Sequence, residues 1–412
     1  MDAQRAVRRN TLLLAIAQGF LYSTLPFLLA VGSVAVVDLS GRKAAVGVLA
    51  ASYFASAAVG ALIVGRWMDR VGRKPGLAVG YVAIALGALA SAGAVERRSA
   101  LLLVLAAVPF GLGAGAALLG RGAVADMHPP DRRGRAVGLV LAASVIGAVG
   151  SAPLVAWLQH VSEDRLGLRP FVGPWLVVPL LAAGGLICVL LLRPDPRDLA
   201  VRDRSAAAAH TGRTRTPREL LALPPFRAAV VAAGIGQAAM IAVMGVAPIV
   251  VHHHGDLAVS GVLSVHFVGM FAFMPLIGVI IDRIGRRRGL VAAVALSATG
   301  VLVGALSTQP VVFGLGLFLV GLGWAVSYLG ATAIVSDVTD PLERSGALGF
   351  TDLLVSLSSA VGGLVGGALL EAGGYPALAV GVAMALVPVL AVVLPLREEA
   401  PGRWPIPEPA EA

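Results

Sequence analysis

Long, nearly uninterrupted apolar stretches are the feature that most constrains how this chain folds. Hydrophobic residues make up 58% of its 412 residues and charged residues only 13%, whereas about a quarter of the residues of an average soluble domain are charged. A helix that crosses the hydrocarbon core of a bilayer needs about 20 predominantly apolar residues. Segments of that length follow one another along the whole chain, so we expect an all-α membrane protein.

Hydropathy and turn residues divide the chain into twelve expected transmembrane helices. These are residues 11–36, 44–66, 76–95, 99–126, 135–160, 173–193, 227–251, 257–281, 289–307, 310–335, 345–371 and 376–396. The first apolar run, from Thr11 to Val37, is too long for the hydrophobic part of a signal peptide, so we expect it to be retained. The single cysteine, Cys188, excludes an intramolecular disulfide.

The basic residues predict the orientation of the helices. The net charge is +9, but Lys and Arg are scattered through the loops, so we expect no nucleic-acid partner. Most of the 32 Lys and Arg residues fall in segments on the same side as both termini. The positive-inside rule then makes both termini cytoplasmic. We expect a monomeric multi-pass protein of the bacterial cytoplasmic membrane, surrounded by membrane lipid.

An internal repeat divides the chain into two halves. One motif occurs as Gly65-x-x-x-Asp69-Arg70-x-Gly72-Arg73-Lys74 and again, 213 residues later, as Gly278-x-x-x-Asp282-Arg283-x-Gly285-Arg286-Arg287. Ala125-Asp126 is similarly matched by Ser336-Asp337. We therefore expect two pseudo-symmetric six-helix bundles with the same orientation. Their bounds are 1–193 for the N-terminal half and 227–412 for the C-terminal half with a short cytoplasmic tail, joined by a flexible cytoplasmic linker at 194–226.

The repeated motif resembles the loop between helices 2 and 3 of the major facilitator superfamily. This resemblance covers all twelve expected helices and implies a transporter that works by alternating access between its two halves. In physical terms, Asp69, Asp282 and the Arg clusters can form a charged cytoplasmic latch, while the glycines permit tight turns and close helix approach. The alternative is that these charges only enforce the topology.

A second superfamily signature, the Gly-Pro-rich stretch in helix 5 of drug antiporters, is present only in part. Gly138 and Gly147 keep its spacing, but Gly150-Ser151-Ala152-Pro153 departs from the glycine-proline ending. This departure disfavours drug-proton antiport.

Few charged residues lie inside the expected helices. Arg121, in the fourth, is the only basic residue well inside one, and Asp126 is near it in sequence. A buried arginine needs a carboxylate or backbone partner. We therefore interpret the two residues either as a structural ion pair or as groups that couple substrate or protons to transport. Asp352, in the eleventh helix, is open to the same two interpretations.

Soft metal ligands gather in the seventh and eighth helices. The chain has eight methionines, and four of them lie between residues 240 and 274. Met240 and Met244 are spaced four apart, as are His266 and Met270, so each pair shares a helix face. Met274 extends the second face by one turn. Thioether and imidazole ligands suit copper, and the carboxylates that a hard cation prefers are almost absent from the predicted pathway. The alternative is packing, since methionine commonly fills gaps in apolar cores.

These two pairs also resemble the CcoA-like (CalT) family of the superfamily. Members of that family import copper, and related members are associated with riboflavin uptake. The resemblance implies that Met240, Met244, His266 and Met270 bind copper as the transported substrate, and no resident cofactor is expected. The outer end of the seventh helix carries His252, His253 and His254. These imidazoles either capture metal before it reaches the methionines or form an ordinary polar loop.

The sequence thus predicts a secondary active transporter, with copper uptake as the first interpretation. The alternative is a transporter of small organic solutes, by riboflavin-like uptake or drug efflux, whose aromatic lining would include Tyr22, Trp324 and Tyr328. A membrane sensor is disfavoured because no segment resembles a signalling output. An enzyme is disfavoured because no nucleophile-base pair or phosphate loop falls in the predicted pathway.

Overall fold

The computed structural model describes residues 3–128, 130–165, 167–199, 215–339 and 343–404, and nearly all of them are helical. The α-helices are α1 (Ala3–Pro26), α2 (Ser33–Ser40), α3 (Ala45–Val71), α4 (Arg73–Glu96), α5 (Ala100–Leu118), α6 (Gly120–Asp126), α7 (Pro130–Asp164), α8 (Val172–Leu190), α10 (Pro217–Ala222), α11 (Pro224–Val251), α12 (Asp256–Phe271), α13 (Met274–Ile284), α14 (Arg286–Leu306), α15 (Pro310–Val338) and α16 (Arg344–Val393). A π-helix, η1 (Phe27–Gly32), and a 3-10 helix, η2 (His252–His254), complete them.

The twelve expected membrane crossings are present in the described part of the chain. Ten helical spans are long and apolar enough to cross a membrane, and α12 with α13 forms a further, bent one. One of the ten, α16, contains two helices, because Gly373 and Gly374 leave the helical conformation in its middle. The chain is therefore a multi-pass membrane protein.

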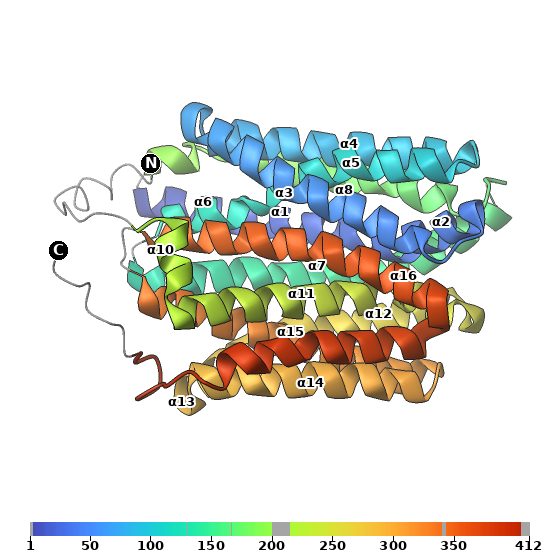
Figure 1. Ribbon diagram of the computed structural model, residues 1–412. Helices are drawn as coiled ribbons and strands as arrows, with labels where there is room; N and C mark the ends of the chain where they lie inside the picture. The colour runs from blue at the N-terminus through green and yellow to red at the C-terminus, as the bar shows by residue number, and fades with distance from the viewer. Residues whose placement is uncertain (1–2, 129, 166, 200–214, 340–342, 405–412) are drawn as a thin grey trace.

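The two halves of the chain form two bundles, which lie one above the other in Figure 1. In the upper bundle α3 and α4 pack on α5 while α8 packs on α4 and α1, and in the lower bundle α15 packs between α14, α11 and α12. The halves meet where α3 packs against α16 and where α7 packs against α12. The described chain starts and finishes at the same end of the molecule (Figure 1). We call this the termini end, and the other the opposite end.

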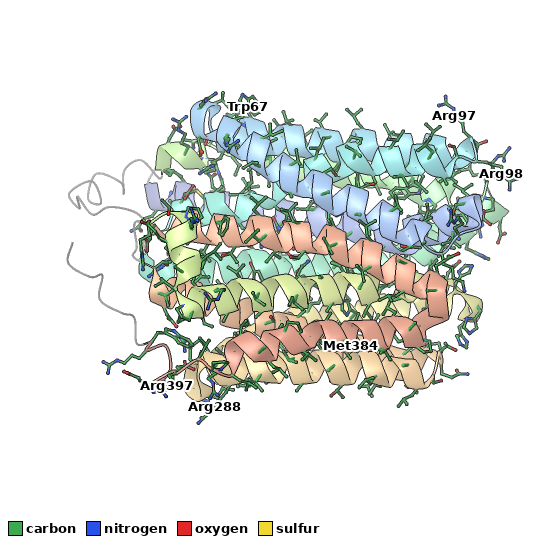
Figure 2. The ribbon with its side chains drawn as sticks, viewed as in Figure 1. Trp67, Arg97, Arg98, Arg288, Met384 and Arg397 are labelled. Carbon is green, nitrogen blue, oxygen red and sulfur yellow. The ribbon has the colours of Figure 1, made fainter. Side chains whose placement is uncertain are left out.

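The surface of the bundle is divided as a bilayer requires. Aliphatic side chains such as Leu180 (70% exposed) and Met384 (67% exposed) cover the flanks, and Figure 2 shows Met384 projecting from α16. The arginines labelled in that figure lie at the two ends, among them Arg98 at the opposite end and Arg397 at the termini end. The flanks therefore face lipid and the ends face water.

Three helices that the sequence predicts as continuous are interrupted, one of them at Leu119 between α5 and α6, and a proline accounts for the other two breaks. The expected helix over 11–36 changes to a π-helix directly after Pro26. The expected helix over 257–281 bends by 41° between α12 and α13, where Pro275 occupies the first turn of α13. Proline lacks the N–H that the preceding turn would bond, and its ring clashes with the carbonyl four residues earlier.

The described end of the linker contains a helix, whereas the sequence predicts a flexible segment. Residues 200–214 lie outside the described residues, but α10 forms part of the expected linker and begins with a capping box between Thr216 and Glu219. Arg215 pairs with Glu343 and donates a hydrogen bond of 2.8 Å to the carbonyl of Val338. The end of the linker is thus fastened to the C-terminal half.

The halves touch most closely at the opposite end. There Ser33 Oγ donates to the carbonyl of Gly245 at 3.1 Å, and the Ala44 N–H donates to Glu371 Oε2 at 3.0 Å. A Cβ added at Gly47 would lie 2.4 Å from the carbonyl oxygen of Gly363, so α3 and α16 approach backbone to backbone. These contacts close the opposite end between the two halves.

We predict that Gly47→Val opens the opposite end, because its side chain cannot fit against Gly363. The measurement is labelling of a Ser33→Cys reporter by a membrane-impermeant thiol reagent, in a Cys188→Ser background. Ser33 is buried at 3% exposure, so its labelling should rise several-fold when the halves separate. Gly349→Val is the control, since a Cβ there meets no atom within 4 Å. Equal labelling in both variants would contradict the prediction.

Candidate transport pathway and its charged supports

At the termini end, the repeated motif forms the same ionic network in each half. Arg73 Nη1 lies 3.2 Å from Asp69 Oδ1, and its Nη2 lies 2.9 Å from Asp126 Oδ2. In the other half, Arg286 Nη1 lies 3.1 Å from Asp282 Oδ1, and its Nε lies 3.0 Å from Asp337 Oδ2. Arg73 at the start of α4 thus connects α3 to α6, and Arg286 at the start of α14 connects α13 to α15.

Two further carboxylates, which the sequence analysis missed, complete these networks. Asp195 accepts hydrogen bonds from the backbone N–H groups of Arg73 (3.0 Å) and Lys74 (2.8 Å). Glu398 accepts the equivalent pair from Arg286 and Arg287, both at 2.9 Å. Each carboxylate therefore satisfies the unpaired N–H groups at the start of a helix and meets the positive end of its dipole. The signal in the sequence was a carboxylate shortly after the last helix of each half.

The glycines of the motif do not all act as expected. Gly72 and Gly285 have φ of 109° and 94°, a backbone conformation that favours glycine, and they make the tight turns. Gly65 makes only an ordinary contact with Leu119, and a Cβ at Gly278 would meet nothing within 4 Å. The close helix approach that the motif glycines were expected to permit is therefore not found at these two positions.

The remaining motif residues fasten each half to its own last helix. Lys74 Nζ donates to the carbonyl of Leu190 at 2.7 Å, and Arg287 Nη2 donates to that of Leu394 at 2.8 Å. The side chains of Arg70 and Arg283 are exposed. Every contact of the motif described above lies within one half or, for Asp195, with the first residues of the expected linker, so the networks make each half rigid. Their action as a latch between conformations stays a prediction.

We predict that Asp195→Ala lowers stability more than Asp69→Asn does. Hydrogen bonds to a charged group contribute about 1.5–3 kcal/mol each, whereas the Asp69–Arg73 pair is an exposed pair four residues apart, worth about 0.3–0.5 kcal/mol. Thermal unfolding of the purified protein can be followed by a thiol-reactive dye, because Cys188 is only 8% exposed. Asp198→Ala, at an exposed position nearby, is the control. Equal unfolding midpoints for Asp195→Ala and Asp198→Ala would rule out the role given to Asp195.

Between the two halves, four aromatic rings form a continuous ladder in the middle of the bundle. Tyr22 of α1 meets Phe271 of α12 edge to face, with ring centroids 5.5 Å apart, and Phe271 meets Trp324 of α15 at 5.8 Å. Trp324 stacks on Tyr328 at 5.3 Å, with an angle of 16° between the planes. The ladder joins both halves, and the Trp324 indole N–H donates to Gln237 Oε1 of α11. Three of the four rings are only half-buried.

Charged groups lie at the end of this ladder nearer the termini. Arg121 Nη1 donates to the Tyr328 hydroxyl at 3.3 Å, so it contacts the other half of the molecule. Asp352 of α16 lies within electrostatic reach of both Arg121 and Tyr22, yet its side chain is exposed. Asp352 thus brings a carboxylate of the C-terminal half close to an arginine and a tyrosine of the N-terminal half. The ladder with these groups is the candidate substrate pathway.

The pairing of Arg121 with Asp126, expected from their nearness in sequence, does not form. Asp126 points to Arg73 instead, and Arg121 Nε makes a long contact of 3.5 Å with the carbonyl of Leu118. Five residues along a helix place two side chains on different faces, which explains the separation. A coupling role for Arg121 or Asp126 stays a prediction, and Asp352 is the carboxylate nearer to Arg121.

The sulfur and imidazole residues lie inside packed helix contacts. Met240, Met244 and Met270 are 2%, 1% and 4% exposed, and His266 is fully buried. His266 Nδ1 lies 2.7 Å from the carbonyl of Leu317 on α15, and its Nε2 has no hydrogen-bond partner among the described residues. α12 packs chiefly on α15 and α7, whereas α11 packs on α16 and α15. Copper binding by these residues stays a prediction.

Two further groups of expected metal ligands, Met274 and the three adjacent histidines, lie apart from the residues above. Met274 was expected to extend the face of His266 and Met270, but the 41° bend falls between Met270 and Met274, so the face does not continue. His252, His253 and His254 are all exposed and form η2 at the opposite end. The rings of His253 and His254 are 4.0 Å apart. Metal capture by these histidines stays a prediction.

Comparison with known proteins identifies the class. The sequence profile of the Major Facilitator Superfamily matches residues 10–260 and 228–411. An uncharacterized MFS-type transporter of Bacillus subtilis (strain 168), YdeG, is 29% identical over 406 residues, which cover 94% of this chain and 93% of YdeG. The riboflavin transporter RfnT of Brucella anthropi is 28% identical over 397 residues, 96% of each chain. The crystal structure of a D-xylose-proton symporter superposes with a TM-score of 0.76 at 17% identity, covering 97% of this chain and 99% of that one.

The fold is that of a membrane transporter with two six-helix bundles. The chain belongs to the Major Facilitator Superfamily, and it is a secondary transporter rather than an enzyme.

Proposed function

We propose that this protein carries a planar aromatic organic solute across the membrane, with riboflavin as the first candidate. The observation that carries the proposal is the aromatic ladder from Tyr22 to Tyr328, which spans both halves in the middle of the bundle. A flat ring bound there would contact both halves at once. Binding would then be sensitive to their relative position, as alternating access requires.

The polar groups around the ladder suit the edge of such a solute. Arg121 supplies N–H donors for ring carbonyls, and Gln237 supplies both a donor and an acceptor. Asp352 offers acceptors for hydroxyl groups, such as those of a sugar-alcohol chain. A substrate that stacked on Trp324 would therefore find hydrogen-bonding partners on α6, α11 and α16. The likeness to a riboflavin transporter over nearly the whole chain supports the same substrate class.

The distribution of charge supports an orientation with the termini in the cytoplasm of a bacterial cell and the protein in its cytoplasmic membrane. The contacts of Ser33 and Gly47 that close the opposite end would then face outward. The structure would correspond to an inward-facing state, and uptake would end with release on the termini side. The protein would act as a monomer, since one chain contributes both halves of the pathway.

We predict that Trp324→Leu and Phe271→Leu reduce riboflavin uptake. Stacking of a base on an aromatic side chain is worth about 1–3 kcal/mol, so the apparent affinity should fall at least about fivefold for each. The measurement is accumulation of radiolabelled riboflavin by cells that depend on this protein, normalised to its amount in the membrane.

Two aromatic residues on the lipid-facing flanks provide matched controls. Trp157 is 59% exposed and Phe273 is 38% exposed, so Trp157→Leu and Phe273→Leu remove the same side chains away from the pathway. Both should transport normally. Uptake that is normal in all four variants, or absent in the wild type, would contradict the proposal.

Copper is the second candidate, and one observation favours it. The hydrogen bond of His266 Nδ1 to a carbonyl places the ring proton on Nδ1, which leaves a lone pair on the buried, unpartnered Nε2. Such a nitrogen is a typical soft-metal ligand. Met270 lies one turn further along the same helix.

We predict that Met240→Leu and Met270→Leu distinguish the two candidates. Exchange of methionine for leucine in a core usually costs less than about 1.5 kcal/mol, so both variants should fold. Leucine cannot ligate copper, so metal accumulation in whole cells would fall to the background if the thioethers bind it, while riboflavin uptake would be unchanged. Copper accumulation equal to that of the wild type would exclude the metal site.

A further inference from the structure

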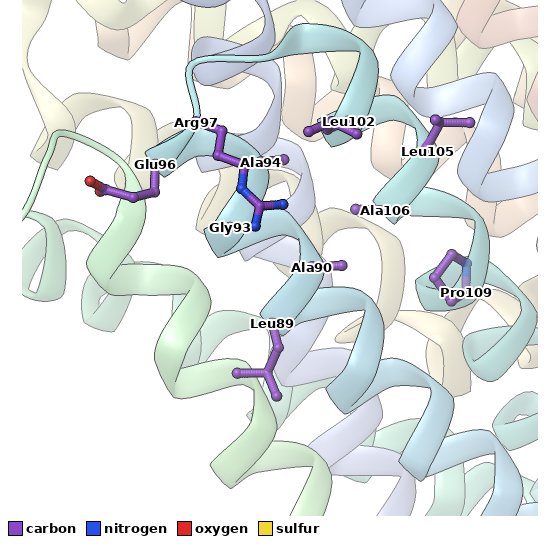
Figure 3. Close-up of a pocket in the computed structure, with 10 residues that line it drawn as sticks. All are labelled: Leu89, Ala90, Gly93, Ala94, Glu96, Arg97, Leu102, Leu105, Ala106 and Pro109. Atoms are coloured by element: carbon purple, nitrogen blue, oxygen red, sulfur yellow. The ribbon is translucent and has the colours of Figure 1, made fainter.

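A groove opens on the flank of the N-terminal half, between the last turns of α4 and the first turns of α5 (Figure 3). Its volume is about 610 Å³, within the range of about 300–1,000 Å³ that is usual for small-molecule sites. Its lining comes from both helices and includes Gly93 and Arg97 at the end of α4 and Leu105 of α5. None of these residues belongs to the aromatic ladder.

The floor of the groove is made of small residues. Ala90, Ala94 and Ala106 are short, and a Cβ added at Gly93 would meet nothing within 4 Å. Leu89 and Leu105 flank this floor and are 47% and 54% exposed. Because this flank faces lipid, the groove is an apolar trough that hydrocarbon rather than water fills.

The mouth of the groove is positively charged. Arg97 directly follows α4, at the boundary of the membrane span, and Figure 3 shows its side chain extending over the groove. Among the described residues, no ion pair or hydrogen bond engages its guanidinium. The adjacent Glu96 is paired with Arg169 at 3.2 Å. A cation at the membrane boundary is thus left for a ligand from outside the chain.

We propose that the groove binds an anionic phospholipid, with one acyl chain in the trough and the phosphate against Arg97. A guanidinium matches the geometry of a phosphate and pairs with it through two parallel hydrogen bonds. The trough runs from this charged mouth along α4 and α5 into the region of the flank that faces hydrocarbon (Figure 3). The cation therefore lies where a lipid phosphate would lie, and the apolar trough lies where its acyl chain would lie. This site is independent of the proposed transport substrate.

The test uses the full-length protein, purified in detergent and incubated with phosphatidylglycerol or phosphatidylcholine, with bound lipid counted by native mass spectrometry. We expect the wild type to retain one more phosphatidylglycerol than phosphatidylcholine. Arg97→Gln should lower the occupancy of that lipid more than fivefold by removing the charge. Gly93→Leu should do the same by filling the trough.

Two control variants test the location of the site. Arg98→Gln removes a neighbouring charge that does not line the groove, and Gly261→Leu fills a glycine position on α12 that also has no atom within 4 Å of its Cβ. Both should keep the lipid, and glycerol 3-phosphate should not displace it. The proposal is overturned if phosphatidylcholine is retained equally by the wild type, if Arg98→Gln loses as much lipid as Arg97→Gln, or if the soluble phosphate displaces the lipid. It is also overturned if Gly93→Leu, with an unchanged unfolding midpoint, binds as the wild type does.

Discussion

The lack of water in the bilayer core is the constraint on which this structure depends. Every backbone N–H and C=O that crosses the membrane needs a partner inside the protein, and helices supply that partner locally. The chain therefore departs from the α-helix only where other groups compensate. The π-helix after Pro26 lies inside the bundle, and the break at Gly373 and Gly374 lies at its end. At the bend before Pro275, on the flank, the Ala272 N–H still donates to the carbonyl of Val268 at 3.0 Å.

Helix ends pose the complementary problem, because their first N–H groups have no partner along the helix. Here Asp195 and Glu398 accept hydrogen bonds from such N–H groups, at equivalent positions relative to the two halves. The arginine that begins each of those helices then reaches two more carboxylates. Local capping and long-range fastening thus use the same residues, and each half becomes a unit that can move as a body. The contacts between the halves are concentrated at the opposite end, where Gly47 and Gly363 touch.

The arrangement of these contacts determines which side chains line the candidate pathway. The helices of the two halves that face each other contribute Tyr22, Phe271, Trp324, Tyr328 and two opposite charges. The methionines of α11 and α12 lie instead inside packed helix contacts. Tyr22, Trp324 and Tyr328 are half-buried between the halves and have faces available to a solute, whereas Phe271 and the buried methionines become available only if the helices around them move.

The sequence by itself determined the class of fold, the number of crossings and the two equivalent halves, because hydropathy and a motif repeated after 213 residues are local in the chain. It also identified three of the four aromatic residues of the ladder as candidates, but not Phe271. Only the tertiary structure decided which residues meet. Arg121 is closer in sequence to Asp126 than to Tyr328, yet it bonds to Tyr328, and His266 Nδ1 contacts the carbonyl of Leu317 on α15. The rotation of each helix about its axis is set by packing against helices far away in the chain, and a single sequence carries no direct record of that packing.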